Sequence, residues 1–288
     1  MGERRILLFG GSGQVGGAIR ALRLPDGVTL VAPGRDQADI VDRAAVDAVL
    51  GSEPWTAVIN TAAWTAVDAA EDAVAGAFAA NALGPAVLAD ATRERGIPLV
   101  HVSTDYVFDG TKDAPYEEDD RTGPVGAYGA SKLAGEEAIR TGTPHHVILR
   151  TSWVYGGPER NFLRTMLRLA ETRDAVQVVD DQWGSPTYAP DLAAALVTIA
   201  LRDDIRDHAG IFHFANRGET TWCRFARAIF ARSAARGGPS ATVEAITTAE
   251  FPTAARRPAN SRLATRRIEE AFAIVPRQWQ DALADAIT

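Results

Sequence analysis

The sequence is short of cysteine: Cys223 is the single one among 288 residues, which excludes an intramolecular disulfide. No cluster of cysteine and histidine has the spacing of zinc ligands either, so we expect no metal site. The residues around Cys223 are typical of a helix. We therefore predict a buried, structural thiol at this position.

An excess of positive charge is also lacking. The formal net charge is -7 at pH 7. Binding to nucleic acid needs clustered lysine and arginine, and the pairs Arg256-Arg257 and Arg266-Arg267 are short. We expect no nucleic-acid partner, although such a pair can bind one small anionic ligand.

Long apolar runs are the third absence. The first apolar run, which ends at Phe9, is too brief for the hydrophobic core of a signal peptide, and we expect that no later apolar stretch could span a membrane. The remaining composition, 46% hydrophobic and 23% charged, is that of an ordinary globular protein with one large domain or two smaller ones. We expect a cytoplasmic protein with no membrane partner.

Glycines follow the first predicted strand, Ile6–Phe9, in the pattern Gly10-x-x-Gly13-x-x-Gly16 and lead into a helical segment. Strand, glycine turn and helix form the context in which this pattern binds a dinucleotide. Gly10 would make the tight turn, Gly13 would let the backbone approach a pyrophosphate, and Gly16 would allow close helix packing. A plain glycine-rich loop is the alternative, which the position at the first turn disfavours. The other cofactor contacts expected in this turn are Ser12, Gln14 and Val15.

The end of the second predicted strand, Val28–Ala32, bears on the choice of cofactor. An NAD-preferring site usually places an acidic residue at this strand end, and none stands there. Arg35 can meet the 2′-phosphate of NADPH instead, or remain a solvated loop arginine, and Asp36 leaves NADH open as a second cofactor. Asp39 is a further expected cofactor contact, and Ile40 is expected to line the adenine pocket.

Small residues follow the third predicted strand, Thr56–Asn60. A cofactor could cross them closely, although tight packing would explain them as well; they are Thr61, Ala62 and Ala63. A long alanine-rich helix is then expected from about Ala69 to Arg95. It carries Asn81, for which bridging of backbone groups is a better prediction than catalysis.

A hydroxyl group and a tyrosine-lysine pair are predicted to meet after the fourth strand, Ile97–Val102. Thr104 follows its carboxyl end, where open α/β sheets bind ligands. Tyr128 and Lys132 begin the next helix and, being four residues apart, lie on one face of it. The ammonium can then lower the pKa of the phenol and make it a usable proton donor. The pair alone would fit many surface helices, and its setting favours an active site.

Alternating strands and helices without internal repeats predict an α/β fold: a doubly wound parallel Rossmann sheet with a smaller, interleaved α/β substrate-binding lobe. The dinucleotide-binding domain is expected at residues 1–151, with the chain returning to it around 174–213. Residues 152–173 and 214–288 are expected to form the substrate-binding lobe.

Capping residues indicate several helix ends. Asp42 is a predicted N-cap for a helix through Leu50, and Thr221 for a helix that begins at Trp222. Pro276 fits the first turn of a last helix.

Motifs along nearly the whole chain resemble one family, the dTDP-4-dehydrorhamnose reductases among the extended short-chain dehydrogenase/reductases. The motifs are Gly10-x-x-Gly13-Gln-Val-Gly16, Asn60-Thr-Ala-Ala-Trp-Thr-Ala-Val-Asp68, Ser103-Thr-Asp-Tyr-Val-Phe108, Tyr128-Gly-x-Ser-Lys-Leu-Ala-Gly-Glu136, Arg150-Thr-Ser-Trp-Val-Tyr155, Asn161-Phe162, Asp181-Gln-x-Gly-x-Pro-Thr187 and Arg256-Arg-Pro-x-Asn-Ser261. The resemblance implies reduction of the C4 ketone of a dTDP-4-keto-6-deoxy-L-hexose by NADPH, with NADH as the second choice.

The resemblance also implies roles for single residues. Tyr128 would protonate the developing alkoxide, Lys132 would lower its pKa and hold the nicotinamide ribose, and Thr104 would hydrogen-bond the same oxygen. The sugar pocket would be lined by Thr65, Val67, Asp105, Tyr106 and Trp153, and the nucleotide or diphosphate would meet Asn161, Gln182 and Arg256. The alternatives are a core position for Trp153, a turn cap for Asp105, and Arg257 in place of Arg256.

The chain departs from the family pattern in two places. Some members dimerise through a magnesium site built from glutamates, and the matching positions here are Ala18 and Pro190, which cannot bind the metal. We expect a monomer or a dimer not built on a metal site. Trp183 and Tyr188 could change which keto sugar is accepted, so an antibiotic or other natural-product deoxysugar is as plausible as rhamnose.

Two other functions are compatible with this fold. A nucleotide-sugar epimerase or 4,6-dehydratase would keep its NAD tightly bound, but dehydratases place an acidic residue after the Thr-Asp pair, where this chain has Tyr106. A non-catalytic regulatory subunit would not need Thr104, Tyr128 and Lys132, and all three are present. A reductase with exchangeable cofactor remains the first prediction.

Overall fold

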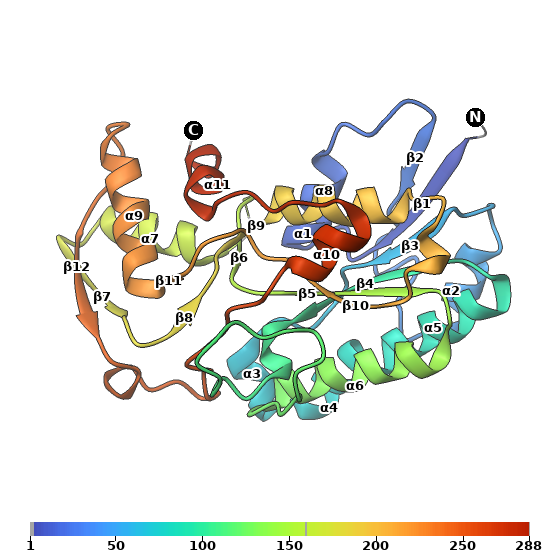
Figure 1. Ribbon diagram of the computed structural model, residues 1–288, viewed down its shortest axis with the longest axis horizontal. Helices are drawn as coiled ribbons and strands as arrows, with labels where there is room; N and C mark the ends of the chain where they lie inside the picture. The colour runs from blue at the N-terminus through green and yellow to red at the C-terminus, as the bar shows by residue number, and fades with distance from the viewer. Residues whose placement is uncertain (1–2, 159, 288) are drawn as a thin grey trace.

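The computed structural model describes residues 3–158 and 160–287, and its centre is a six-stranded sheet in the order β10-β5-β4-β3-β1-β2 (Figure 1). All neighbouring strands of this sheet run parallel. This confirms the predicted doubly wound parallel sheet. The strands are β1 (Arg4–Phe9), β2 (Val28–Val31), β3 (Ala57–Asn60), β4 (Leu99–Thr104), β5 (His146–Thr151) and β10 (Gly210–His213).

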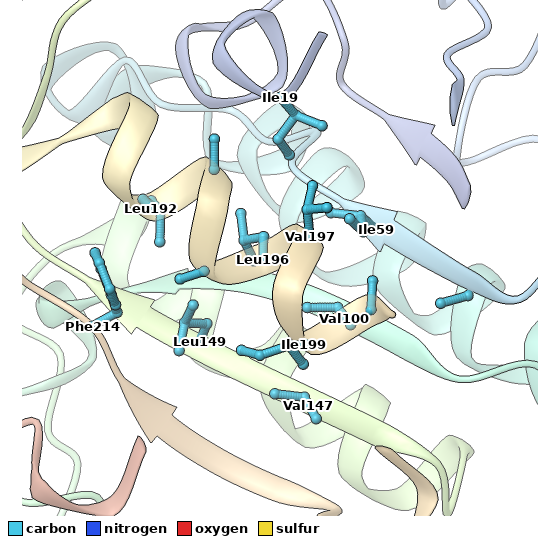
Figure 2. Packing of buried hydrophobic residues seen from close by; sticks show 14 of the residues in the cluster. Ile19, Ile59, Val100, Val147, Leu149, Leu192, Leu196, Val197, Ile199 and Phe214 are labelled. Carbon is cyan, nitrogen blue, oxygen red and sulfur yellow. The ribbon is translucent and has the colours of Figure 1, made fainter. Parts of the chain in front are cut away.

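Helices cover both faces of the sheet because successive side chains of a buried strand point to opposite sides. Ile6 and Leu8 pack with α1, α8 and α10, whereas Leu7 and Phe9 pack with α2, α5 and α6. Figure 2 shows side chains of α8 lying over those of β4 and β5 on the first of these faces. The helices are α1 (Gln14–Ala21), α2 (Arg43–Leu50), α5 (Gly84–Arg95), α6 (Ala127–Gly142), α8 (Ala189–Ala200) and α10 (Arg266–Phe272).

The strand order reverses at β1, which lies between β2 and β3. In open α/β sheets, ligands bind outside the carboxyl ends of the strands at such a reversal. The glycine turn follows β1 and the segment 61–63 follows β3. Both predicted cofactor-binding segments therefore lie at the place where this fold binds ligands.

A second, smaller core lies beside the sheet, at the left of Figure 1. Its strands β7 and β12 pair in parallel, and residues of its three helices pack around them. Cys223 is fully buried here in α9, as predicted. The elements are α7 (Phe162–Ala170), β7 (Ala175–Val179), α9 (Trp222–Ala234), β12 (Thr242–Ile246) and α11 (Trp279–Ala286).

The residues at which the chain crosses between the six-stranded sheet and the smaller core differ from those expected. β7 pairs with β12 and does not join the six-stranded sheet, so the chain returns to the sheet with α8, later than residue 174. The reason is its burial: Val176 and Val178 are buried while Gln177 is exposed, which suits a small two-layer lobe rather than a sheet covered on both faces. Ile268 and Phe272 of α10 also pack in the main core. The division into two domains itself stays a prediction.

The single helix expected from Ala69 to Arg95 is divided into α3 (Val67–Asp72), α4 (Val74–Phe78), a π-helical turn η1 (Ala79–Leu83) and α5. The π turn lies where α6 packs most closely: a Cβ added to Gly135 would come within 2.0 Å of the Asn81 carbonyl oxygen. Such turns are frequent at functional sites.

The continuous helical run Val74–Arg95 is 22 residues long and, by length and composition alone, apolar enough to cross a membrane. The expectation that no stretch has this property was therefore wrong. Leu88, Ala89 and Ala91 of this run are fully buried in the core. Val74 and Leu83 of the same run are exposed, and 39% of its apolar 18-residue window is buried in the protein.

Two of the predicted helix caps are confirmed. The Asp42 carboxylate accepts hydrogen bonds from the first turn of α2, and the Thr221 hydroxyl accepts one from the first turn of α9. The last helix, however, begins at Trp279 and not near Pro276. Backbone hydrogen bonds to Arg217 on both sides of residue 278 keep this segment extended and delay the helix.

Candidate active site

The turn after β1 is packed against the segment after β3. Gly10 has a φ of +82°, and a Cβ added to it would lie 2.3 Å from the Ala62 nitrogen. A Cβ on Gly16 would lie 2.1 Å from the Gly10 oxygen. The Thr61 hydroxyl donates to the carbonyl oxygens of Phe9 and Gly10, at 2.9 and 3.2 Å. These contacts explain why the turn needs glycine at positions 10 and 16.

The same turn leaves backbone N–H groups open at the start of α1. Gly13 is the N-cap and provides no side-chain cap, and a Cβ added to it would meet only the Gly10 oxygen, at 3.6 Å. Ser12 and Gly13 are exposed, and Gln14 and Val15 are half-buried. An uncapped helix N-terminus beside a residue without a side chain fits the pyrophosphate of a dinucleotide.

Of the residues after β2 that are expected to bind the cofactor, Arg35 is exposed and Ile40 is buried. The Arg35 side chain is 84% exposed, and its Nε donates to the Asp39 carboxylate at 2.9 Å. Ile40 is only 6% exposed, and a Cβ added to Gly84 would lie 2.4 Å from its Cδ1. Ile40 thus packs in the core, which leaves little of its side chain for an adenine ring. Contact of these residues with a cofactor stays a prediction.

A buried chain of hydrogen bonds leads from the segment after β3 to Lys132. The Ala62 N–H donates to Asn60 Oδ1, at 3.0 Å, and Asn60 Nδ2 lies 3.0 Å from His101 Nδ1. His101 Nε2 lies 3.2 Å from Lys132 Nζ, which also donates to the Val102 carbonyl at 2.7 Å. The sequence motifs do not predict a role for His101; the one available signal is a lone histidine inside an apolar strand.

Tyr128 forms a hydrogen bond with Thr104, so two of the three predicted catalytic side chains meet. Burial raises the pKa of Tyr128 above its ordinary value, and the hydrogen bond with Thr104 offsets part of this rise. The expectation that Lys132 lowers this pKa is wrong, because Lys132 Nζ is directed at Val102 and His101. Burial lowers the pKa of Lys132 itself to about 8, which Glu136 opposes.

Asn81 fixes the helix that carries Tyr128. Its Oδ1 accepts from the Trp64 N–H at 2.8 Å, and its Nδ2 donates to the Trp64 carbonyl and to the Ser131 hydroxyl, both at 3.0 Å. The Ser131 hydroxyl donates to the Tyr128 carbonyl at 2.7 Å. The predicted bridging of backbone groups by Asn81 is confirmed.

Asp105 and Tyr106 surround the tyrosine. Asp105 is 3% exposed and accepts a hydrogen bond from Thr104 at 3.0 Å; burial raises its pKa to about 6, against hydrogen bonds with Ser261 and Thr104. The Tyr106 ring meets the Tyr128 ring edge-on, with 5.5 Å between centroids. Burial and Asp105 raise the pKa of Tyr106 to about 12, while Arg257, to which it is hydrogen-bonded, lowers it. Both side chains thus lie where a substrate would meet Tyr128.

Arg257, which interacts with Tyr106, is one of the residues that line a cavity of about 470 Å³. Lys112, Arg257 and Arg262 also line it, and each is paired with a carboxylate, Asp120, Asp68 and Glu219 respectively. The exposed Arg256 lines the cavity and has no ion pair with residues 3–158 or 160–287. It is therefore the lining arginine best able to meet an anionic ligand.

The aromatic residues of the predicted sugar pocket form a stack. Trp153 has a φ of +50°, a strained value for a bulky residue, and its ring lies 3.6 Å from that of Trp222, centroid to centroid. A Cβ added to Gly184 would lie 2.4 Å from the Trp153 ring. The next residue back, Trp183, lines the cavity, and Arg224 lies over its ring at 4.8 Å. Trp222, which the sequence motifs do not single out, supports Trp153.

The structure supports the remaining predicted substrate contacts less well. Thr65 is exposed, and Val67 begins α3, whose Asp68 is ion-paired with Arg257 beside the cavity. Asn161 caps α7 by accepting from the Arg164 N–H. Gln182 is buried and donates to the Thr248 hydroxyl at 3.0 Å. The structure gives Asn161 and Gln182 structural contacts, and neither lines the cavity.

The metal-binding pattern of some family members has no counterpart at its two positions. Ala18 packs against the main core, and Pro190 lies in the first turn of α8. Within residues 3–158 and 160–287, no group of three or more His, Cys, Asp and Glu residues could hold a metal ion.

The fold and the glycine turn define a Rossmann-type protein of the extended short-chain dehydrogenase/reductase class. The family model described as the RmlD substrate binding domain matches residues 4–288. A dTDP-4-dehydrorhamnose reductase of Sinorhizobium fredii is 43% identical over 281 residues, which cover 96% of this chain and 95% of that relative. The chain belongs to the RmlD family.

Solved structures give the same result. A dTDP-4-dehydrorhamnose reductase of Bacillus anthracis, in complex with NADP, superposes with a TM-score of 0.92 at 33% identity and covers 99% of both chains. A dTDP-glucose 4,6-dehydratase of Streptomyces venezuelae, with NAD bound, has a TM-score of 0.79 at 18% identity and covers 98% of this chain and 95% of its own. The second likeness shows the fold alone.

Proposed function

We propose that this chain reduces the C4 ketone of a dTDP-4-keto-6-deoxy-L-hexose, dTDP-4-dehydrorhamnose or a related natural-product deoxysugar, with NADPH. The observation that carries the proposal is the hydrogen-bonded pair of Tyr128 and Thr104 beside Lys132, at the ligand-binding edge of the sheet. The near full-length match to reductases with that activity in their names supports it. NADH is the second choice of cofactor.

The side chains of the site can supply acid catalysis. NADPH supplies the hydride when bound. The hydroxyl of Tyr128 donates a proton to the substrate oxygen as negative charge develops, and the Thr104 hydroxyl hydrogen-bonds the same oxygen. The raised pKa keeps Tyr128 protonated at neutral pH, and an alkoxide is a stronger base than a phenolate, so the transfer is favourable. Lys132 holds the nicotinamide ribose.

The cofactor is held by the segments at the strand reversal. The backbone N–H groups of residues 12, 14 and 15, which make no backbone hydrogen bond in the part of the chain that the structure describes, would bind its pyrophosphate, and the segment 61–63 would lie against it. Arg35, in the loop after β2, binds the 2′-phosphate with Asp39 as its partner. Arg35 is the residue that would favour NADPH over NADH.

The substrate extends from Tyr128 into the cavity of about 470 Å³. Arg256 binds the diphosphate, because guanidinium and phosphate form two parallel hydrogen bonds. The sugar lies among Thr65, Val67, Asp105, Tyr106 and Trp153. Trp183 lines the cavity and helps to determine which sugar is accepted. In this proposal Asn161 and Gln182 support the binding of the nucleotide indirectly. Asn161 caps α7, and Gln182 holds the segment that contains Thr248.

The setting of the enzyme follows from the same features. We place it in the cytoplasm, where its buried thiol stays reduced, as a monomer or as a dimer not built on a metal site. Light scattering with and without EDTA tests the second point. A dimer that EDTA dissociates would contradict it.

The proposed function is tested by following NADPH consumption on a panel of dTDP-4-keto-6-deoxyhexoses, prepared with and without a 3,5-epimerase and a C-methyltransferase. We expect turnover with the sugars of L configuration. A protein purified with tightly bound NAD⁺ that consumes no NADPH with any of these sugars would support an epimerase or dehydratase instead.

A further inference from the structure

Asn60, His101 and Lys132 form a buried polar chain, and the reaction described above uses Lys132 but gives no role to Asn60 or His101. Their exposed fractions are 0%, 0% and 2%. They come from three neighbouring elements, β3, β4 and α6, and are joined by contacts of 3.0 and 3.2 Å. Because buried polar groups must satisfy their donors and acceptors, the position of each proton in this chain can be deduced.

The orientation of Asn60 decides the tautomer of His101. The Ala62 N–H is a donor, so the Asn60 atom that it meets is the oxygen Oδ1, and Nδ2 faces the ring. Nδ2 donates to His101 Nδ1. Burial lowers the pKa of His101 well below its ordinary value, with Lys132 contributing, so the ring is neutral and carries one proton. With Nδ1 accepting, this proton lies on Nε2.

The proton on His101 Nε2 points at Lys132 Nζ, 3.2 Å away. A lysine ammonium has three donors and no acceptor, so two donors would face each other inside the protein. A neutral amine removes this conflict: it accepts from His101 and still donates to the Val102 carbonyl. Glu136 is the charged group that favours the ammonium, and its two oxygens are bound by Arg150.

We propose that His101 is a positioning residue that, oriented by Asn60, holds Lys132 as a neutral amine in the cofactor-free enzyme. This inference rests on the proposed function, because that function places Lys132 against the ribose. Beyond that function, we infer that His101 controls the protonation state of Lys132.

The test measures the protonation of Lys132 directly. The chain contains two lysines, Lys112 and Lys132, so protein labelled with ¹³C-lysine gives two side-chain signals in an NMR titration, and Lys112→Arg assigns them. In the cofactor-free protein we expect Lys132 to titrate below pH 8, because the Nε2 proton adds to the effect of burial. A midpoint above pH 8 would leave Lys132 an ammonium at neutral pH and would overturn the proposal.

His101→Gln separates the proposed role from a packing role. Its amide can turn an oxygen toward Lys132 and accept from the ammonium, so the Lys132 midpoint should rise by about one pH unit or more. A folded variant with an unchanged midpoint would overturn the proposal.

A second measurement needs no variant. In ¹⁵N-histidine-labelled protein, His101 should carry its proton on Nε2, and a proton on Nδ1 instead would refute the deduction. Neither readout involves turnover. Failure of NADPH consumption therefore counts against the proposed function, whereas the Lys132 midpoint and the His101 tautomer decide this inference.

Discussion

Glu136 and Arg150 form a bidentate ion pair in which the side chains are 0% and 2% exposed. Arg150 Nε donates to Oε1 at 2.9 Å and its Nη2 to Oε2 at 2.6 Å. The guanidinium also lies over the Phe108 ring, 4.9 Å from its centroid. The pair joins β5 to α6 one turn after Lys132, so it fixes the helix on which the proposed proton donor stands.

Replacing Glu136 with Gln should destabilise the fold strongly. The variant leaves a buried guanidinium without its counter-charge, a change that lowers the free energy of unfolding by about 3–5 kcal/mol. Urea unfolding followed by circular dichroism measures the loss. Glu137→Gln is the matched control, because that carboxylate is 53% exposed in its pair with Arg140, and a surface pair contributes about 1 kcal/mol or less. Equal losses in the two variants would contradict a structural role for the buried pair.

Tyr128→Phe should abolish most of the turnover while the cofactor still binds. A positioned general acid contributes about 10²-fold or more to the rate, and the phenylalanine ring keeps the edge-on contact with Tyr106. NADPH consumption and NADPH fluorescence titration measure the two properties separately. Tyr106→Phe removes a neighbouring hydroxyl and should have the smaller effect on turnover. Near-normal turnover in Tyr128→Phe would refute the assignment.

The sequence predicts those parts of the site that local spacing determines. Gly16 is explained by a contact within the turn itself, and Thr104 is found because it ends a strand. Gly10 is found from the same local spacing, although its closest contact is with Ala62, 52 positions later. His101 is not found, because its role depends on Asn60, 41 positions earlier. The π turn within the helix expected from 69 to 95 is likewise not found; its Asn81 carbonyl lies against Gly135 of α6, 54 positions later, and no local pattern reveals that contact.

Asp105 should make the stability of the protein depend on pH. Its pKa is about 6 in the folded protein against an ordinary 3.8. Below pH 3.8 the carboxyl is protonated in both states and contributes nothing. Between pH 3.8 and 6 it ionises first in the unfolded chain, which lowers the free energy of unfolding by about 1.4 kcal/mol per pH unit, so that above pH 6 the full loss is about 3 kcal/mol.

Asp105→Asn should therefore stabilise the fold above pH 6 and have little effect below pH 3.8. Unfolding curves at the two pH values measure this difference. Asp109→Asn is a control of opposite sign, since the hydrogen bond from Tyr116 lowers the pKa of Asp109. Its carboxylate stabilises the fold above the ordinary pKa, and this contribution is lost as the pH falls. A pH-independent effect of Asp105→Asn would contradict the assigned burial cost.

Gly10→Ala should destroy the cofactor-binding turn. The added methyl group would lie 2.3 Å from the Ala62 backbone nitrogen, in a residue with a φ of +82°. Gly27→Ala is the matched control, because Gly27 has a φ of +78° and nothing within 4 Å of the added Cβ. The control should lose only the cost of the left-handed backbone, about 1–2 kcal/mol, and still bind NADPH. If both variants bound NADPH equally well, the close packing of the glycine turn against the segment after β3 would not be needed for cofactor binding.

Arg256 and Arg257 are adjacent in sequence and should nevertheless have different functions. Arg257 Nη2 lies 2.6 Å from the Asp68 carboxylate, 189 positions earlier, and Arg256 is the exposed lining residue without such a pair among residues 3–158 and 160–287. Arg256→Ala should raise KM for the dTDP-sugar by about 10-fold or more with little change in kcat, because a hydrogen bond to a charged group contributes about 1.5–3 kcal/mol.

Arg257→Ala should instead resemble Asp68→Asn, since either change breaks the same ion pair and frees the α3 segment beside Tyr106. Both variants should lower kcat, which steady-state kinetics over a range of sugar concentrations separates from KM. If Arg257→Ala raised KM alone and Arg256→Ala had no effect, Arg257 would be the diphosphate ligand. The ion pair would then have to open when substrate binds, and Asp68→Asn should tighten substrate binding because it frees the guanidinium in advance.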